Sequence, residues 1–156
     1  VPLPIGGQRL FVLGDGFHLL VGDRLALWYL STRGAPPQPV APGLQGLSNG
    51  LLDEHWPKVA RGKANLDRAL GRDAGLEGLL EVVNDRHQPA DSELPETGVS
   101  RDLERLVAPV FIQSEQYGTR ASSAVQLHHD GHIEMAEQNW RPDGQPDGPI
   151  RYSRAL

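Results

Sequence analysis

The sequence predicts an α+β fold, in which strands and helices occupy separate parts of the chain. Short runs of branched and aromatic residues lie in the first third, leucines and valines at helical spacing dominate the middle, and alternating runs return toward the C-terminus. Segregation of this kind is typical of α+β domains, whereas a parallel sheet requires strands and helices to alternate. The 156 residues have room for one such domain.

Three strands are predicted in the first third. Residues 9–13, 17–21 and 25–31 are apolar runs with aromatic and branched side chains. Only Gly22, Asp23 and Arg24 separate the second run from the third, so these two form a hairpin. Residues 34–43 contain four prolines and predict a connector with little regular structure.

Three helices are predicted in the middle of the chain. Pro57 follows two acidic residues, a combination typical of a first helical turn, and helical spacing continues to about residue 72. A second helix is predicted over residues 76–83. A third begins after Ser100, whose side chain caps it, and ends before Pro109.

Strands return in the last third, over residues 110–113 and 119–129, and Asp130-Gly131 turns the chain into a strand over residues 132–137. Small residues on both faces of the 119–129 strand predict that it is covered on both sides. The residues after Trp140 are rich in proline and glycine and predict a loosely ordered tail. We therefore expect one domain over residues 1–140 and a tail over 141–156.

Composition excludes several classes of function. The net charge of −5 argues against non-specific binding of nucleic acid, which requires clustered positive charge. No apolar run approaches the roughly 20 residues of a membrane-spanning helix. The absence of cysteine excludes disulfides and thiolate metal sites within the sequence, and the cytoplasm is the default location to expect.

Candidate site residues begin in the segment over residues 46–63. Asn49, followed by glycine, can aim its amide outward as a donor to an oxyanion, or it can simply form a tight turn. Trp56 and Lys58 flank the proline of the first predicted helix, either as parts of a ligand site or as an aromatic cap and a solvated lysine. Lys63 is a further ligand-binding candidate on that helix.

Arg120 lies in a strand that is expected to be covered on both sides. Burial of an arginine is costly unless it is paired, so Arg120 is expected either to form a buried ion pair or to hold an anionic ligand in a pocket.

Histidines provide weaker candidates. His129 and His132 flank the hairpin turn and could face one another around a metal or a haem iron, although solvated side chains are the simpler interpretation, and no metal site is predicted. His18, in an apolar strand, is expected to be half-buried and hydrogen-bonded. Residues 94–98 match a cell-wall sorting signal, but no membrane span follows, so we reject that interpretation.

Five segments, in order, resemble the NRDE family, also called the transport and Golgi organisation protein 2 family. They are GFHLLVGD, LWYLSTR, GLSNGLLDEHWPKVARGK, LPETGV and VFIQSEQYGTRASSAVQLHHDGHI. The resemblance runs from about residue 16 to about residue 137. It implies an αββα sandwich like that of the N-terminal-nucleophile hydrolases, with Asn49 similar to an oxyanion donor. In that superfamily the first residue of the processed chain, often cysteine, is the nucleophile.

The sequence lacks the Asn-Arg-Asp-Glu motif and the initial Met-Cys of the family, and residues 84–87 (Asn-Asp-Arg-His) are unrelated to that motif. We therefore expect a C-terminal portion, in which the sandwich is incomplete on its N-terminal side. Such a portion would hold one wall of a site, with Asn49 and Arg120, and would expose a sheet through which copies of the chain could associate.

Three functions follow from the resemblance. The first is binding and trafficking of a small amphipathic anionic ligand, such as haem or an acyl-coenzyme A, with haem as the one cofactor to consider. The second is an amidohydrolase acting on a non-peptide C–N bond, whose nucleophile is not in this sequence, so that the chain alone is inactive. The third is a structural portion without activity.

Overall fold

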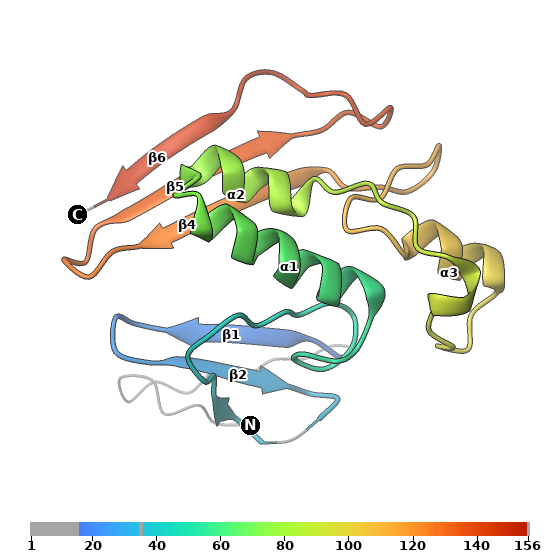
Figure 1. Cartoon of the computed structure of the whole chain (residues 1–156), viewed down its shortest axis with the longest axis horizontal. Helices are drawn as coiled ribbons and strands as arrows, with labels where there is room; N and C mark the ends of the chain where they lie inside the picture. The colour runs from blue at the N-terminus through green and yellow to red at the C-terminus, as the bar shows by residue number, and fades with distance from the viewer. Residues whose placement is uncertain (1–15, 35, 156) are drawn as a thin grey trace.

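Two antiparallel sheets of three strands and three α-helices make up the described part of the chain, which comprises residues 16–34 and 36–155 of a computed structural model (Figure 1). This mixture of antiparallel sheets and separate helices agrees with the predicted α+β class. The strand expected at residues 9–13 lies outside the described residues.

The first sheet has the order β1-β2-β3. Strands β1 (His18–Gly22) and β2 (Leu27–Ser31) pair as the predicted hairpin, and the Asp23 carboxylate closes its turn by accepting from the backbone amides of Leu25 and Ala26. Strand β3 (Gln38–Pro39) falls within the connector for which prolines predicted little regular structure. An edge strand tolerates proline because one side of it needs no donor.

The three predicted helices are present. Helix α1 (Pro57–Gly71) starts at the expected proline, and α2 (Gly75–Val83) follows it. Helix α3 (Arg101–Val107) is capped by Ser100, whose hydroxyl accepts from the Leu103 amide at 3.3 Å, as predicted. A short 3₁₀ turn, η1 (Asp91–Glu93), lies in the loop before α3.

The second sheet has the order β4-β5-β6. Strands β4 (Ala121–Leu127) and β5 (Ile133–Asn139) form the predicted hairpin with slightly different bounds. Strand β6 (Arg151–Ala155) pairs with β5 in a stretch whose composition predicted a loosely ordered tail. The free edge of β5 provides backbone hydrogen-bond partners for β6, which the composition of the segment does not reveal. The division of the chain into a domain and a tail at residue 140 stays a prediction.

The strand predicted over residues 110–113 is wrong. Of those residues only Gln113 forms a bridge, to Gly118. Phe111 is instead a core residue: its ring is almost fully buried and meets Trp140 edge-on at 4.9 Å between ring centroids. The apolar character of the run therefore reflects packing rather than sheet formation.

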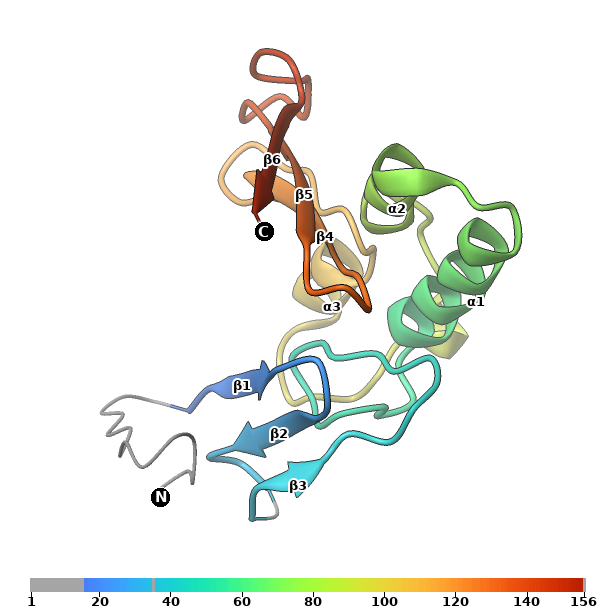
Figure 2. The same ribbon diagram turned by 90° about the vertical axis from the view of Figure 1, so that its left-hand side faces the viewer.

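Helix α2 covers one face of the second sheet, and α1 lies beside α2 on that same side (Figure 2). Leu80 of α2 packs on Ala124 and Ala136, whose small side chains let the helix approach the strands closely. The opposite face of the sheet carries Val125, Leu127 and Ile133, all exposed, and we call it the open face. The prediction that the 119–129 strand is covered on both faces thus holds for one face only.

Among the helices of the described residues, none combines the length and the apolar character that crossing a membrane would require.

Candidate functional site

Helix α1 separates two pockets, because residues three and four positions apart share one face of a helix. One face, with Val59, Gly62 and Leu66, lines a largely apolar pocket. The other, with Arg61 and Asn65, lines a charged pocket. Lys58 lies at the border between the two faces and belongs to both linings.

The first of these, the apolar pocket, has a volume of about 640 Å³. It lies between α1, the C-terminal end of α2 and the loop that precedes α1. Its apolar walls are Leu47, Val59, Leu66, Val82, Val83, Val110 and Ile112. Three of the predicted site residues, Asn49, Lys58 and Lys63, also line it. Apolar walls with a few polar groups are typical of a small-molecule site.

Asp53 ties the loop of the apolar pocket to α1. One of its carboxylate oxygens accepts from Lys63 Nζ at 2.9 Å and from the Gly46 amide at 2.8 Å, while the Asp53 amide donates to the Gly46 carbonyl at 2.7 Å. The hydrogen bond from Lys63 is the main reason that the pKa of Asp53 is lowered, and the Gly46 amide adds to the effect. The charge of Lys63 is therefore already matched by a carboxylate.

Lys58 has no such partner in the described part of the chain. Its ammonium donates to the backbone carbonyl of Val107 at 2.9 Å and lies 5.4 Å from the ring centroid of Trp56. Burial lowers the pKa of Lys58, and the more distant Glu104 opposes that shift. A half-buried ammonium without a paired carboxylate can accept an anionic ligand.

Asn49 and Trp56 each share a pocket lining with Lys58, but not the same one. Asn49 is exposed at the apolar pocket, and its amide makes no hydrogen bond to any described residue. Trp56 is the N-cap residue of α1 and donates from Nε1 to Glu54 at 3.0 Å. It shares a third, very small cavity with Lys58 rather than lining the apolar pocket.

Arg120 is not brought to the apolar pocket. It directly precedes β4, its side chain is exposed, and it forms no ion pair with the residues that the structure describes. The burial expected for this arginine is therefore not observed, although its neighbours Ser122 and Ala124 are buried as the alternation requires. A role for Arg120 toward a ligand stays a prediction.

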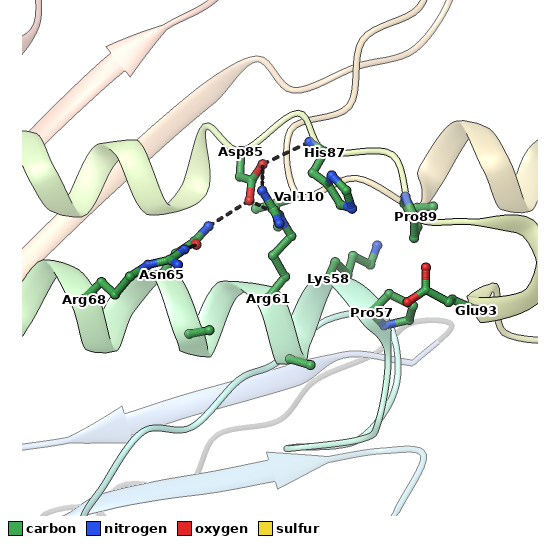
Figure 3. A pocket seen from close by; sticks show the side chains of 13 residues that line it. Pro57, Lys58, Arg61, Asn65, Arg68, Asp85, His87, Pro89, Glu93 and Val110 are labelled. Carbon is green, nitrogen blue, oxygen red and sulfur yellow. Dashed lines mark hydrogen bonds and ion pairs between the residues drawn. The ribbon is translucent and has the colours of Figure 1, made fainter.

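Asp85 is the central side chain of the charged pocket, which has a volume of about 350 Å³ (Figure 3). Its carboxylate accepts from the Arg61 guanidinium, from Asn65 Nδ2 at 2.7 Å and from the His87 amide at 2.9 Å. Burial alone would raise the pKa of Asp85, but these hydrogen bonds outweigh it and lower the pKa. An ionised carboxylate whose lone pairs are taken in this way is suited to holding structure rather than to accepting a proton from a substrate.

Asp85 is a site residue that the sequence patterns did not predict. The available signal was on α1, where Arg61 and Asn65 are four residues apart and so present two donors from one face. Their acceptor lies 20 or more positions away, in a loop with no periodic pattern.

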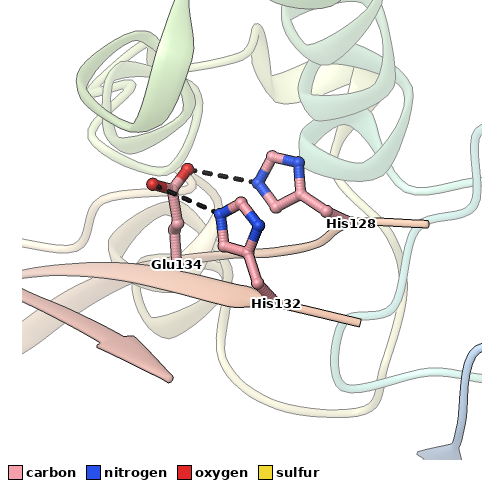
Figure 4. Close-up of side chains that lie close together, drawn as sticks. All are labelled: His128, His132 and Glu134. Atoms are coloured by element: carbon pink, nitrogen blue, oxygen red, sulfur yellow. Dashed lines mark hydrogen bonds and ion pairs between the residues drawn. The ribbon is translucent and has the colours of Figure 1, made fainter. Parts of the chain in front are cut away.

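A histidine cluster forms at the end of the β4–β5 hairpin, but with a different membership from the one predicted (Figure 4). The rings of His128 and His132 stack at 4.1 Å between centroids, and Glu134 lies beside both. His129, expected to face His132, is exposed. The reason is register: the His128 amide donates to the His132 carbonyl, which places these two residues opposite one another.

His18 is half-buried in β1, as expected. Its Nδ1 is 2.8 Å from the hydroxyl of Tyr29, and the two rings stack. This histidine is therefore a satisfied part of the first sheet.

Comparison with known proteins identifies the family. The family model described as Transport and Golgi organisation 2 matches residues 13–142. A bovine Transport and Golgi organization protein 2 homolog is 34% identical over 142 residues, which cover 81% of this chain. The human protein of that name is 29% identical over 146 residues. A mouse Transport and Golgi organization 2 homolog is 27% identical over 146 residues.

The matched part amounts to 51% of each of these relatives, so the chain spans about half the length of the curated relatives it matches. The family match covers both pockets, the histidine cluster and every predicted site residue. The resemblance found in the sequence segments is confirmed, and the chain belongs to the Transport and Golgi organisation 2 family.

Proposed function

We propose that this chain contributes the apolar pocket to a protein that binds and carries a small amphipathic anionic ligand in the cytoplasm. The observation that carries the proposal is the combination of seven apolar wall residues with the Lys58 ammonium at their edge. A hydrocarbon portion of the ligand would lie against the walls, and its carboxylate or phosphate would meet Lys58.

Acyl-coenzyme A and haem are the two ligand classes to compare. The described residues that line the apolar pocket include no histidine, cysteine, methionine or tyrosine, which are the usual axial ligands of haem iron. Haem would therefore be held through its ring face and propionates, without coordination of the iron. This chemistry favours the acyl chain as the better fit.

Titration with palmitoyl-coenzyme A, followed by calorimetry, tests the proposal, and a parallel titration with haem is followed at the Soret band. Lys58→Gln removes the unpaired charge, and we expect binding of either ligand to weaken about tenfold, which corresponds to roughly 1.4 kcal/mol. Arg68→Gln is the matched control, since it removes one positive charge from α1 outside the apolar pocket. Arg120→Ala tests the prediction that Arg120 contributes to the affinity for an anionic ligand.

Binding that is equal in the unaltered chain and in Lys58→Gln would contradict the assignment of this pocket. If neither ligand binds to the chain or to a longer protein that contains it, the ligand-carrying function is wrong, and the structural role without activity remains.

We further propose that the complete domain is an αββα sandwich. Helix α2 covers one face of the β4–β6 sheet, while the open face carries exposed Val125, Leu127 and Ile133. An apolar sheet face of this kind favours packing against a further sheet, in addition to the two sheets of the described residues. Where no such sheet covers the open face, two copies of the chain would associate through their open faces.

A second candidate function is hydrolysis of a non-peptide C–N bond. It is favoured by Asn49, whose amide lies at the apolar pocket with its donors unused by the described residues. Such a donor could stabilise an oxyanion, but the superfamily nucleophile is a terminal residue, often cysteine, and the sequence contains no cysteine. We therefore expect no amide turnover from this chain alone. Turnover that is present, and lost in Asn49→Ala, would overturn that expectation.

A further inference from the structure

The histidine cluster has the composition of a metal site. His128, His132 and Glu134 each offer a ligand atom, and these atoms lie within 4.8 Å of one another. All three residues are half-buried, and they come from one hairpin that is separate from the two pockets. We propose that this cluster binds a divalent transition-metal ion such as Zn²⁺.

The donor atoms converge on one side of the hairpin. His128 Nε2 lies 3.1 Å from one oxygen of Glu134, and His132 Nε2 lies 3.6 Å from the other (Figure 4). Two imidazole nitrogens therefore point at a single carboxylate. A metal ion between them would replace the hydrogen bond that now joins His128 to Glu134 and would bind the lone pair of His132 Nε2.

The backbone of the hairpin fixes this arrangement. The His128 amide donates to the His132 carbonyl, and the Gly131 amide donates to the His128 carbonyl, both at 2.9 Å. His132 and Glu134 are two positions apart, so their side chains emerge from the same face of the sheet. The three ligands are thus preorganised within seven consecutive residues, and binding would order little additional chain.

Asp130 orients one of the ligands. Its carboxylate accepts from the His132 amide at 3.0 Å and lies 3.2 Å from His132 Nδ1. A proton on Nδ1 would be donated to Asp130, which leaves the Nε2 lone pair free for a metal. Carboxylates that hold metal-binding histidines in this way are a general feature of such sites.

Arg154 contacts two of the three proposed ligands. Its Nη2 is 3.1 Å from His132 Nε2, and its Nε is 3.8 Å from Glu134. Arginine is always a donor, so this contact also requires a lone pair on His132 Nε2. The Arg154 side chain is 64% exposed and can turn toward solvent when a metal ion displaces it. The positively charged guanidinium would therefore compete with a metal ion for His132 and Glu134.

The ligand set determines the class of metal. Imidazole nitrogens combined with one carboxylate suit Zn²⁺, Co²⁺, Ni²⁺ and Cu²⁺, whereas Ca²⁺ and Mg²⁺ require mainly oxygen ligands. Three protein ligands leave at least one coordination position to water or to a further ligand.

Titration of the untagged full chain with Co²⁺, followed by its visible absorption bands, tests the proposal, and Zn²⁺ then displaces the Co²⁺. We expect one ion per chain. His128→Ala and Glu134→Gln should each weaken binding at least about tenfold, and Asp130→Asn should weaken it by about 10- to 100-fold as a residue that orients a ligand. His129→Ala is the matched control, since it removes an exposed neighbouring histidine outside the cluster.

Arg154→Gln provides the opposite test, because loss of the competing cation should tighten Co²⁺ binding. This exposed substitution leaves the core unchanged, so it decides the question even if His128→Ala fails to fold. The proposal is overturned if neither the unaltered chain nor Arg154→Gln gives saturable Co²⁺ bands. It is equally overturned if the affinity is the same in His128→Ala, or if it falls as far in His129→Ala.

Discussion

The Asp85 side chain joins helix α1 to the loop that follows α2. Arg61 and Asn65 approach it from α1, and the His87 amide approaches it from the loop that follows α2. Only 12% of the Asp85 side chain is exposed. Loss of the carboxylate charge would weaken the hydrogen bonds from Arg61 and Asn65, of which the Arg61 side chain, 42% exposed, also has access to water.

Asp85→Asn should therefore lower the free energy of unfolding by about 1.5–3 kcal/mol, the range expected for hydrogen bonds to a charged group. Urea denaturation measures the change. Asp102→Asn is the control: Asp102 also pairs with an arginine, but its side chain is 92% exposed, and we expect no measurable loss of stability. Equal effects of the two substitutions would contradict the role given to Asp85.

Asp85 also predicts a dependence of stability on pH. Because the folded state lowers the pKa of Asp85 below its ordinary value of 3.8, the unfolded chain binds this proton more readily. The stabilisation is complete above about pH 5 and is lost as the pH falls through and below 3.8. The difference in stability between the unaltered chain and Asp85→Asn should shrink over that window, and a difference that grows with acidity would have the wrong sign.

Residues next to Asp85 have equally distant partners. Arg86 lies over the ring of Phe111 at 4.1 Å from its centroid and donates to the Gly144 carbonyl at 2.6 Å. Asn84 accepts from the Ser122 hydroxyl at 2.6 Å. The partners of these polar loop residues are 25 to 58 positions away along the sequence, so no local pattern could have predicted them.

At the scale of elements, α3 is tied to the preceding loop by Glu104. This residue is buried, with 4% of its surface exposed, and one of its oxygens accepts from both the amide and the hydroxyl of Thr97. These two hydrogen bonds are the main reason that the pKa of Glu104 is lowered. The segment over residues 94–98 is thereby held against a helix.

Glu104→Ala should free this segment, and exchange of the Thr97 amide hydrogen should become faster. Hydrogen exchange followed by nuclear magnetic resonance measures the change at Thr97 itself. Glu96→Ala removes an exposed carboxylate from the same loop and serves as the control, with unchanged exchange expected. Protection of Thr97 that survives in Glu104→Ala would show that other contacts hold the loop.

The elements differ in how well the sequence predicts them. Helix α1 and the β4–β5 hairpin have strong local signals, Pro57 with its helical spacing and the Asp130-Gly131 turn, and both form as predicted. Strand β6 has no such signal, because all five of its residues are exposed. It is defined by pairing with β5 and by the Tyr152 hydroxyl, which donates to Glu77 of α2 at 2.6 Å.

At the scale of the whole molecule, the open face predicts association of the chain with itself. Val125→Glu places a charge where 58% of an apolar residue is now exposed, and it should shift the chain toward monomer in light scattering coupled to size-exclusion chromatography. Leu70→Glu makes a similar change at a residue of α1 that is 53% exposed, and it should have no effect. Association that persists in Val125→Glu would place the contact elsewhere.

The site could be predicted only where its residues are close in sequence. Asn49, Lys58 and Lys63 lie in one loop and the helix that follows it, and the structure brings them to the same pocket. The family resemblance grouped Arg120 with Asn49, and the strand pattern around Arg120 predicts a face of a sheet but not which helix covers it. Arg120 lies outside the pocket lining because of tertiary packing, which cannot be read from the sequence of one segment.

Lys58 has one further consequence, because its single ammonium lies on the border of two linings. A ligand in the apolar pocket that binds the Lys58 ammonium would move this charge away from the charged pocket and from the Val107 carbonyl. Ligands in the two pockets would therefore compete for the Lys58 ammonium without contacting one another. Thermodynamic linkage requires such antagonism to be reciprocal: each guest weakens the other by the same factor.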